Sequence, residues 1–144
     1  MQVRYSGSNK KNLSEQETSV QPQISISNAE GPYTLIMIDP DAGKKSPTNK
    51  SPGNTKGLYY LHWLVVNIPV SGDVTQGDAL VPYAGPTPPP NTGQHRYQFI
   101  LYKQSVGIVK GMNIRERSNW SLQNFLEGKG LTEVARETIR VPQA

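Results

Sequence analysis

Two nearly uninterrupted apolar runs constrain this chain most strongly. They are "LIMI", within Tyr33 to Asp39, and "WLVVNI", within Tyr60 to Ile68. Both segments are rich in β-branched and aromatic residues, which favour strands, and prolines or glycines stand beside both. A strand that is apolar without alternation is covered on both faces. We therefore expect these two segments to be strands at the centre of a sheet.

Two further segments have the pattern of strands. They are "QISIS" (Gln23 to Ser27) and "HRYQFILYKQ" (His95 to Gln104). In the second, alternation places Tyr97, Phe99 and Leu101 on one side and Arg96, Gln98 and Ile100 on the other. Twelve prolines and 13 glycines separate such short runs along the chain. This distribution predicts a mainly β fold rather than a helical bundle.

One short helix is expected near the C-terminus. Ser121 can cap it, and Gly128 can take the left-handed conformation that ends it. Leu122, Phe125 and Leu126 share one face at helical spacing, which favours packing on the core over a membrane or partner surface.

Length and charge limit the classes of protein. A chain of 144 residues suits a single domain, residues 1–144, in which we expect part of the polar segment 1–20 to be flexible. The net charge of +4 comes from scattered lysines and arginines, unlike the clustered footprint of a nucleic-acid-binding protein. The absence of cysteine excludes disulfides and thiolate chemistry. Without an apolar signal core or a membrane-spanning run, a cytoplasmic protein with no integral membrane association is expected.

Two acids and the two histidines stand at strand ends or within strands. Asp39 and Asp41 flank Pro40 at the end of a buried strand, His62 lies inside an apolar strand, and His95 follows the proline-rich loop. We expect these side chains to converge at one end of the sheet. Each also has a plainer interpretation, because buried histidines are usually satisfied core residues and acids often stabilise turns.

The proline-rich segment "PTPPP", Pro86 to Pro90, has its own alternative. Such a run can be a polyproline ligand for another domain, although no low-complexity sequence flanks it here.

Taken together, the motifs resemble a known family. "YTLIMIDPDAG" and "LHWLVVNIP" resemble a first signature, D-P-D-A-P followed by H-[WF]-L-V-x-[ND]-I. "YAGPTPPPNTGQHRYQF" resembles a second, Y-x-G-x-x-P-P leading to G-x-H-R-[YF], and "RSNWSLQNFLEGKGL" and "VRYS" resemble further family segments. From about Val3 to Val141, the chain is similar to the phosphatidylethanolamine-binding protein family, which includes the Raf kinase inhibitor protein and plant flowering regulators.

The resemblance implies a fold of antiparallel β-sheets, Greek-key-like, with a few short peripheral helices. It also implies a small anion pocket at one end of the central sheet. The ligand-binding residues implied by position are Asp39, Asp41, Tyr60, His62, Gly85, Pro89, His95 and Tyr97.

These residue types suit a phosphate or phosphoester. Histidine N–H groups and loop amides can donate to phosphate oxygens, and a carboxylate can hold a histidine tautomer or accept from an ammonium. Prolines stiffen the loop and reduce the entropy lost on binding. Because His95 and Tyr97 share a face, Arg96 leaves it, and we expect Arg96 to pair with Asp41 rather than bind an anion.

Two departures from the family pattern affect the pocket. Gly43 replaces the final proline of D-P-D-A-P, which predicts a more mobile wall. The chain also ends soon after "ETIRV", which predicts a C-terminally short version of the fold and a more open pocket.

Three functional classes follow. The favoured one is a non-enzymatic protein without catalytic residues, cofactor or metal, which binds a phosphate, phosphoester or phospholipid headgroup. Its protein partner would be a kinase, a protease or a phosphorylated protein, as for its relatives. One alternative is a metal-assisted hydrolase that uses the same histidines and acids. Another is a basic membrane-surface module that uses the lysines of 44–56.

Overall fold

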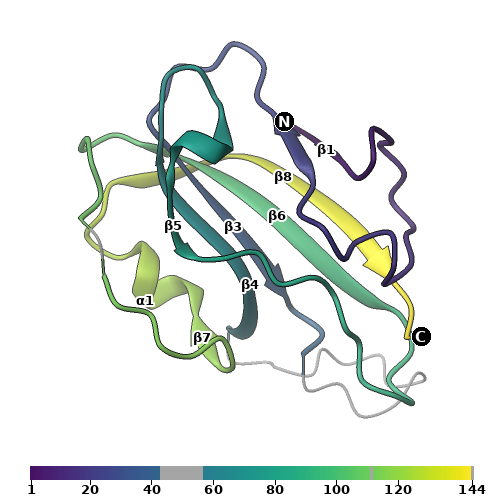
Figure 1. The fold of residues 1–144 in the computed structure, drawn as a ribbon. Coiled ribbons are helices and arrows are strands. Elements are labelled where there is room, and N and C mark those ends of the chain that lie inside the picture. The colour runs from purple at the N-terminus through teal and green to yellow at the C-terminus, as the bar shows by residue number, and fades with distance from the viewer. Residues whose placement is uncertain (43–56, 111, 144) are drawn as a thin grey trace.

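The computed structural model describes residues 1–42, 57–110 and 112–143 (Figure 1). Its main sheet has the strand order β5-β4-β3-β6-β8, and all neighbours are antiparallel. These strands are β3 (Tyr33–Asp39), β4 (Leu58–Ile68), β5 (Asp78–Val81), β6 (His95–Gln104) and β8 (Leu131–Val141). Because β6 returns beside β3 after the run β3-β4-β5, the connection is a Greek key. The expected mainly β, antiparallel fold is confirmed.

Smaller elements flank this sheet. β1 (Gln2–Arg4) pairs with β2 (Gln23–Ser25), and β7 (Trp120–Ser121) pairs with the start of β4. A 3-10 turn, η1 (Val74–Gln76), precedes β5, and α1 (Leu122–Leu126) follows β7.

The central strand β3 is buried on both faces, as its apolar sequence predicts. Leu35 and Met37 belong to one hydrophobic cluster and Ile36 and Ile38 to another, so successive side chains enter different cores. All four are at most 1% exposed. The interior position expected for "LIMI" and "WLVVNI" is confirmed, because β3 and β4 both have neighbours on each side.

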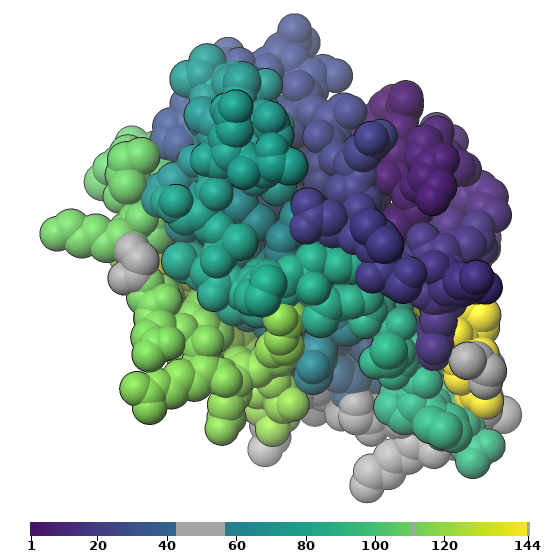
Figure 2. Space-filling view, in the orientation of Figure 1, coloured from purple at the N-terminus to yellow at the C-terminus, as the bar shows by residue number. Residues whose placement is uncertain are grey.

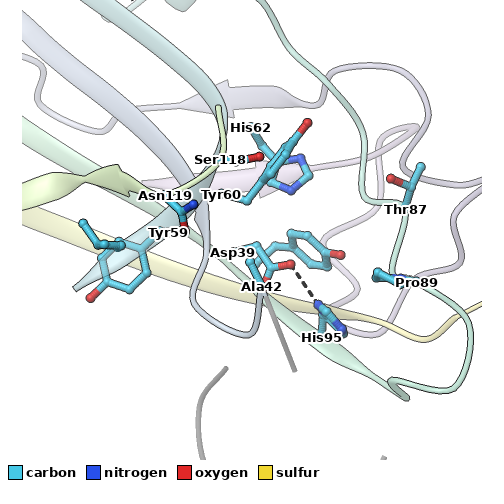
Figure 3. Close-up of a pocket in the computed structure, with 12 residues that line it drawn as sticks. Asp39, Ala42, Tyr59, Tyr60, His62, Thr87, Pro89, His95, Ser118 and Asn119 are labelled. Atoms are coloured by element: carbon cyan, nitrogen blue, oxygen red, sulfur yellow. Dashed lines mark hydrogen bonds and ion pairs between the residues drawn. The ribbon is translucent and has the colours of Figure 1, made fainter. Parts of the chain in front are cut away.

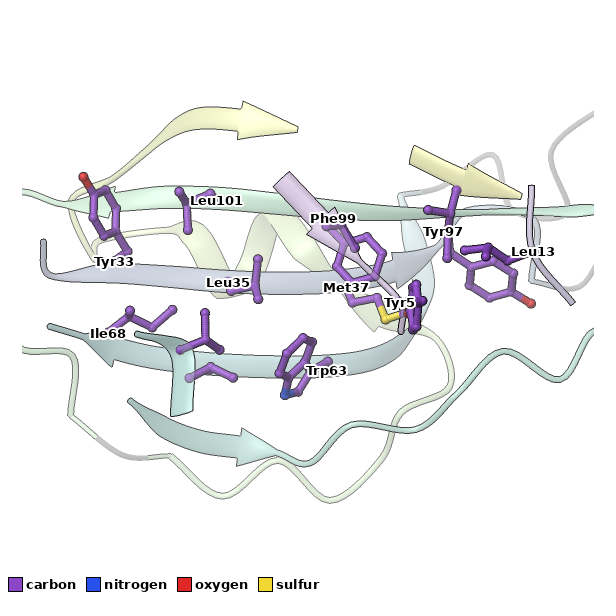
Figure 4. Close-up of a cluster of buried hydrophobic side chains, with 14 of the residues drawn as sticks. Tyr5, Leu13, Tyr33, Leu35, Met37, Trp63, Ile68, Tyr97, Phe99 and Leu101 are labelled. Atoms are coloured by element: carbon purple, nitrogen blue, oxygen red, sulfur yellow. The ribbon is translucent and has the colours of Figure 1, made fainter. Parts of the chain in front are cut away.

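The N-terminal segment covers the first face. Val3, Tyr5 and Leu13 are buried in the cluster that contains Leu35, Trp63 and Phe99 (Figure 4). In the space-filling view this purple segment lies against the rest of the domain beside the teal residues of the 80s (Figure 2).

The segment around α1 covers the second face. Phe125 is buried against the cluster of Ile36 and Ile38, with Leu122 and Leu126 packed beside it. The Ser121 hydroxyl accepts the Asn124 N–H at the start of α1, and Gly128 has a φ of 71° after its end. The predicted helix and its packing role are confirmed.

Strand β8 has no clear pattern in the sequence. Most of its residues are half-buried or exposed, and it contains the strong helix formers Glu133, Ala135 and Arg136. Pairing with β6 along its whole length outweighs this local preference. The short strands β5 and β7 were also not predicted, and β2 ends two residues before the predicted Ser27.

Antiparallel pairing brings the chemically interesting residues to one edge. Asp39, the last residue of β3, lies opposite Tyr60 near the start of β4, and His95 begins β6. On the face of the first cluster, Asp39 continues the row of Leu35 and Met37 in β3. His95 likewise continues the row of Tyr97, Phe99 and Leu101 in β6. The edge is therefore a polar extension of an apolar core.

At the other edge of the sheet, a network of hydrogen bonds joins β3, β4 and β6. Gln104 is 3% exposed, and its Oε1 accepts the Thr34 hydroxyl at 2.7 Å and the Asn67 N–H at 2.8 Å. Its Nε2 donates to Asn67 Oδ1 at 3.0 Å and to the Gly107 carbonyl at 2.9 Å. Each hydrogen-bonding group of this amide is thus used inside the protein.

We expect Gln104→Leu to lower the free energy of unfolding by about 3 kcal/mol, because several buried polar groups lose their partner. Chemical denaturation measures the change. The matched variant Gln21→Leu changes an exposed loop residue, and its effect should stay within about 0.5 kcal/mol. Equal effects of the two substitutions would contradict a stabilising role for the network.

Candidate ligand-binding site

A cavity of about 340 Å³ opens at this edge of the sheet (Figure 3). Six of the eight predicted site residues line it: Asp39, Tyr60, His62, Pro89, His95 and Tyr97. Thr87, Ser118 and Asn119 line it as well. Segments distant in the sequence therefore meet around one space, of the size that accommodates a small ligand.

Asp39 and His95 form a buried pair at the cavity. The Asp39 Oδ2 lies 2.8 Å from His95 Nδ1, and the two side chains are 7% and 1% exposed. The other oxygen, Asp39 Oδ1, accepts the Asp41 N–H at 2.7 Å. The buried carboxylate is therefore satisfied on both oxygens by the protein itself.

Thr92 fixes the second ring nitrogen of His95. The Thr92 hydroxyl donates to the Pro89 carbonyl at 2.6 Å, and His95 Nε2 lies 2.9 Å from the same hydroxyl oxygen. Because a hydroxyl has a single proton, its oxygen accepts from His95 Nε2, which carries a hydrogen. One further proton is then shared between His95 Nδ1 and Asp39.

His62 occupies a β-bulge of β4. The pairing of β3 with β4 passes from Met37 opposite Trp63 to Ile38 opposite Leu61, so His62 is the extra residue. Its Nδ1 lies 2.7 Å from the Ala84 carbonyl oxygen, which can only accept, so Nδ1 carries the proton. In the neutral ring, Nε2 is then an acceptor.

The pKa of His62 lies below its ordinary value. Burial is the largest cause, and the nearby charges of Arg117 and His95 act in the same direction. The Ala84 carbonyl and the Asp39 charge oppose this shift without cancelling it. His62 is therefore neutral at neutral pH.

Arg117 holds the backbone of the bulge. Its guanidinium donates to the carbonyls of His62 at 2.9 Å and Pro82 at 2.7 Å, and its own carbonyl accepts the Leu61 N–H at 2.8 Å. The Ala84 N–H also donates to the His62 carbonyl, at 2.9 Å. The His62 carbonyl and the Leu61 N–H of the bulge are thus hydrogen-bonded by segments outside the sheet.

Aromatic rings connect the two histidines. The ring of His62 lies 4.7 Å from Tyr60 and 5.1 Å from Tyr97, and Tyr97 lies 6.3 Å from His95, between ring centroids. Burial, followed by the charge of Asp39, raises the pKa of Tyr97. The Tyr97 hydroxyl therefore keeps its proton at neutral pH.

Asp41 is not among the residues that line the cavity. Its carboxylate accepts from the Arg96 backbone N–H at 2.8 Å, from Nε at 3.1 Å and from Nη2 at 2.9 Å. Burial opposes ionisation of Asp41, but these hydrogen bonds and the Arg96 charge outweigh it and lower the pKa of the carboxyl. The predicted Arg96–Asp41 ion pair is confirmed.

Gly85 also lies outside the cavity lining. A Cβ at this position would come within 2.7 Å of the Thr18 carbonyl oxygen, so glycine permits the loop to pack on the N-terminal segment. The Tyr83 hydroxyl donates to that same carbonyl at 2.7 Å. These contacts anchor the start of the proline-rich loop.

Some expectations concern segments outside the described residues, namely Gly43 and the lysines of 44–56. Within the described ranges, no group of three or more histidine, cysteine or acidic side chains is placed to hold a metal ion. The same ranges contain no helix long and apolar enough to cross a membrane.

Sequence reasoning missed Thr92, Arg117, Ser118 and Asn119. The last three belong to "RSNWSLQNFLEGKGL", which resembles a family segment but carries no pattern of its own that indicates a ligand site. Thr92 lies three residues before His95, and only the folded loop brings its hydroxyl to the ring.

Comparison with known proteins gives consistent results. The protein-family model described as phosphatidylethanolamine-binding protein matches residues 3–139. The chain is 41% identical over 95 residues to "Protein MOTHER of FT and TFL1 homolog 2" of Oryza sativa subsp. japonica, which covers 65% of this chain and 49% of that protein. It is 38% identical over 95 residues to "Protein FLOWERING LOCUS T" of Arabidopsis thaliana, which covers 66% and 49%. The chain spans about half the length of the curated relatives it matches.

Solved structures share the fold. A carboxypeptidase Y inhibitor, solved with its cognate proteinase, matches with a TM-score of 0.71 at 23% identity, over 99% of this chain and 82% of that chain. A phosphatidylethanolamine-binding protein from Plasmodium vivax matches with a TM-score of 0.63 at 26% identity, over 99% and 80%. With the match of the family model over most of its length, this chain belongs to the phosphatidylethanolamine-binding protein family.

Proposed function

We propose that this protein is a non-enzymatic modulator that binds a phosphate or phosphoester group in the cavity of Asp39, His62 and His95. One observation carries the proposal. Hydroxyl and amide groups of Tyr60, Thr87, Tyr97, Ser118 and Asn119 surround a single open cavity, and none of them makes a hydrogen bond to another described residue. Such groups are suited to several oxygens of one small anion.

The Asp39–His95–Thr92 row superficially resembles the acid–histidine–nucleophile arrangement of a hydrolase. The Thr92 hydroxyl is buried, however, and directs its proton to the Pro89 carbonyl rather than to the histidine. An activated nucleophile requires the opposite direction of donation. This arrangement supports a binding role over a catalytic one.

The partner class follows from the family. One protein of this fold is named as an inhibitor of carboxypeptidase Y and was solved with its proteinase. We propose that the present protein likewise acts through a protein partner, a protease, a kinase or a phosphorylated protein, with the cavity as the anion-binding part of its surface.

We expect the double substitution Tyr60→Phe with Tyr97→Phe to weaken phosphate binding about tenfold or more, because two donors are lost while the rings remain. Two-dimensional NMR titration with phosphate and with phosphorylethanolamine measures the affinity. Tyr102→Phe is the matched control, since Tyr102 is a buried tyrosine in the second hydrophobic cluster. Unchanged affinity in the double variant would reject the cavity as the anion site.

We expect His95→Ala to abolish phosphate binding and to lower the free energy of unfolding by about 3 kcal/mol, because the buried Asp39 carboxylate loses its partner. Combining it with Asp39→Asn removes the unpaired charge and should restore part of the stability without restoring binding. Undiminished binding by folded His95→Ala protein would contradict the proposal.

The lowered pKa of His62 predicts a pH dependence of stability. The unfolded chain binds a proton near the ordinary value of about 6.5, whereas the folded chain binds it only at lower pH. The stability contributed by neutral His62 is complete above about pH 6.5. It is lost as the pH falls towards the folded pKa, by at most about 1.4 kcal/mol per pH unit. Urea denaturation between about pH 7 and pH 5 should show a shallower loss for His62→Gln, and an identical slope would refute the assignment.

A further inference from the structure

His62 presents an acceptor to the cavity. Its Nδ1 proton is committed to the Ala84 carbonyl at 2.7 Å, and no described residue bonds its Nε2. His62 is one of the residues that line the cavity, so a ligand there can approach its ring. Figure 3 shows the His62 ring among the side chains that line the cavity. Because Nδ1 carries the proton, a ligand that reaches Nε2 meets a lone pair rather than an N–H.

His95 offers no N–H to the cavity either. Both of its nitrogens are within 2.9 Å of protein acceptors, Asp39 Oδ2 and Thr92 Oγ1. Freeing one of them for a ligand would leave a buried polar group without its partner.

Asp39 offers no donor to a ligand either. Its carboxylate borders the cavity, and its two oxygens are already engaged by the Asp41 N–H and by His95 Nδ1. Among the described lining residues, the side-chain donors without a hydrogen bond to another described residue are hydroxyls and the Asn119 amide, which suit unprotonated oxygens. One ligand atom must instead donate to His62 Nε2.

We propose that the cavity selects a phosphate group that brings its own proton. The preferred class is inorganic phosphate or a phosphomonoester in its singly protonated form, whose P–OH donates to His62 Nε2 while its other oxygens accept from the tyrosine and serine hydroxyls. Phosphodiesters and sulfate have no such proton at neutral pH and are rejected. The inference rests on the proposed function, because it specifies which phosphate chemistry the anion site takes.

Methyl phosphate and dimethyl phosphate form a matched pair of probes. Near pH 6, much of the methyl phosphate carries one proton and one charge, whereas dimethyl phosphate has the same charge without the proton. We expect methyl phosphate to bind about tenfold more tightly or better, as measured by NMR titration. Sulfate controls for size, because it is as small as phosphate and unprotonated, and it should bind as weakly as the diester.

His62→Gln tests the residue assigned to this selection. A glutamine amide can rotate to donate, so the preference for methyl phosphate should fall to about threefold or less. The Tyr102→Phe control should keep the full preference. A preference that survives in His62→Gln overturns the assignment.

Glycerophosphorylethanolamine separates a lipid headgroup from a free monoester, because it is a diester whose ammonium can also donate. Binding of this compound as tight as that of methyl phosphate would overturn the monoester proposal. Equal binding of methyl and dimethyl phosphate would overturn it too and leave the proposed anion site standing. If none of the probes binds, both the inference and the proposed function fail.

Discussion

Burial of β3 on both faces is the constraint on which the rest of the structure depends. A central strand with apolar side chains in both directions needs a cover on each side. The N-terminal segment supplies one and the segment around α1 supplies the other. Asp39 belongs to the same strand, so its carboxylate is buried along with the apolar residues before it. A buried carboxylate must be compensated locally, which explains why His95 and the Asp41 N–H stand against it.

Because His95 compensates the buried Asp39 carboxylate, its ring nitrogens are not available to a ligand. His95 is a candidate anion ligand by sequence, yet both its nitrogens are used to satisfy Asp39 and Thr92. Its contribution to the cavity is therefore to hold Asp39 and to present its ring. His62 Nε2 and the surrounding hydroxyl groups, by contrast, make no hydrogen bond to another described residue. The residues that the sequence marks most strongly, Asp39 and His95, are thus the ones whose polar atoms are engaged within the protein.

The sequence predicts the parts of this structure that local patterns encode. The bounds of β3 and β6 follow from their apolar and alternating residues, and the meeting of Asp39, His62 and His95 follows from their positions in strands. The amphiphilic β8 was missed because its pairing with β6, not its own composition, makes it a strand. The tautomer of His62 was also beyond the sequence, since it depends on the backbone carbonyl of Ala84, 22 residues away. Contacts to backbone atoms of distant loops leave no residue pattern to detect.

The bulge at His62 lets β4 contribute both to the hydrophobic core and to the cavity lining. In a regular strand, His62 and Trp63 would point to opposite faces. Here Trp63 packs in the first hydrophobic cluster, and His62 contacts Tyr97 of that same cluster at the adjoining cavity. Because of the extra residue, β4 places Trp63 in the core and His62 in the cavity lining on the same face of the sheet. Such a bulge leaves backbone groups unpaired unless other segments satisfy them, and Arg117 and Ala84 do so. The acceptor at His62 Nε2 is thus a product of the backbone irregularity as much as of the histidine itself.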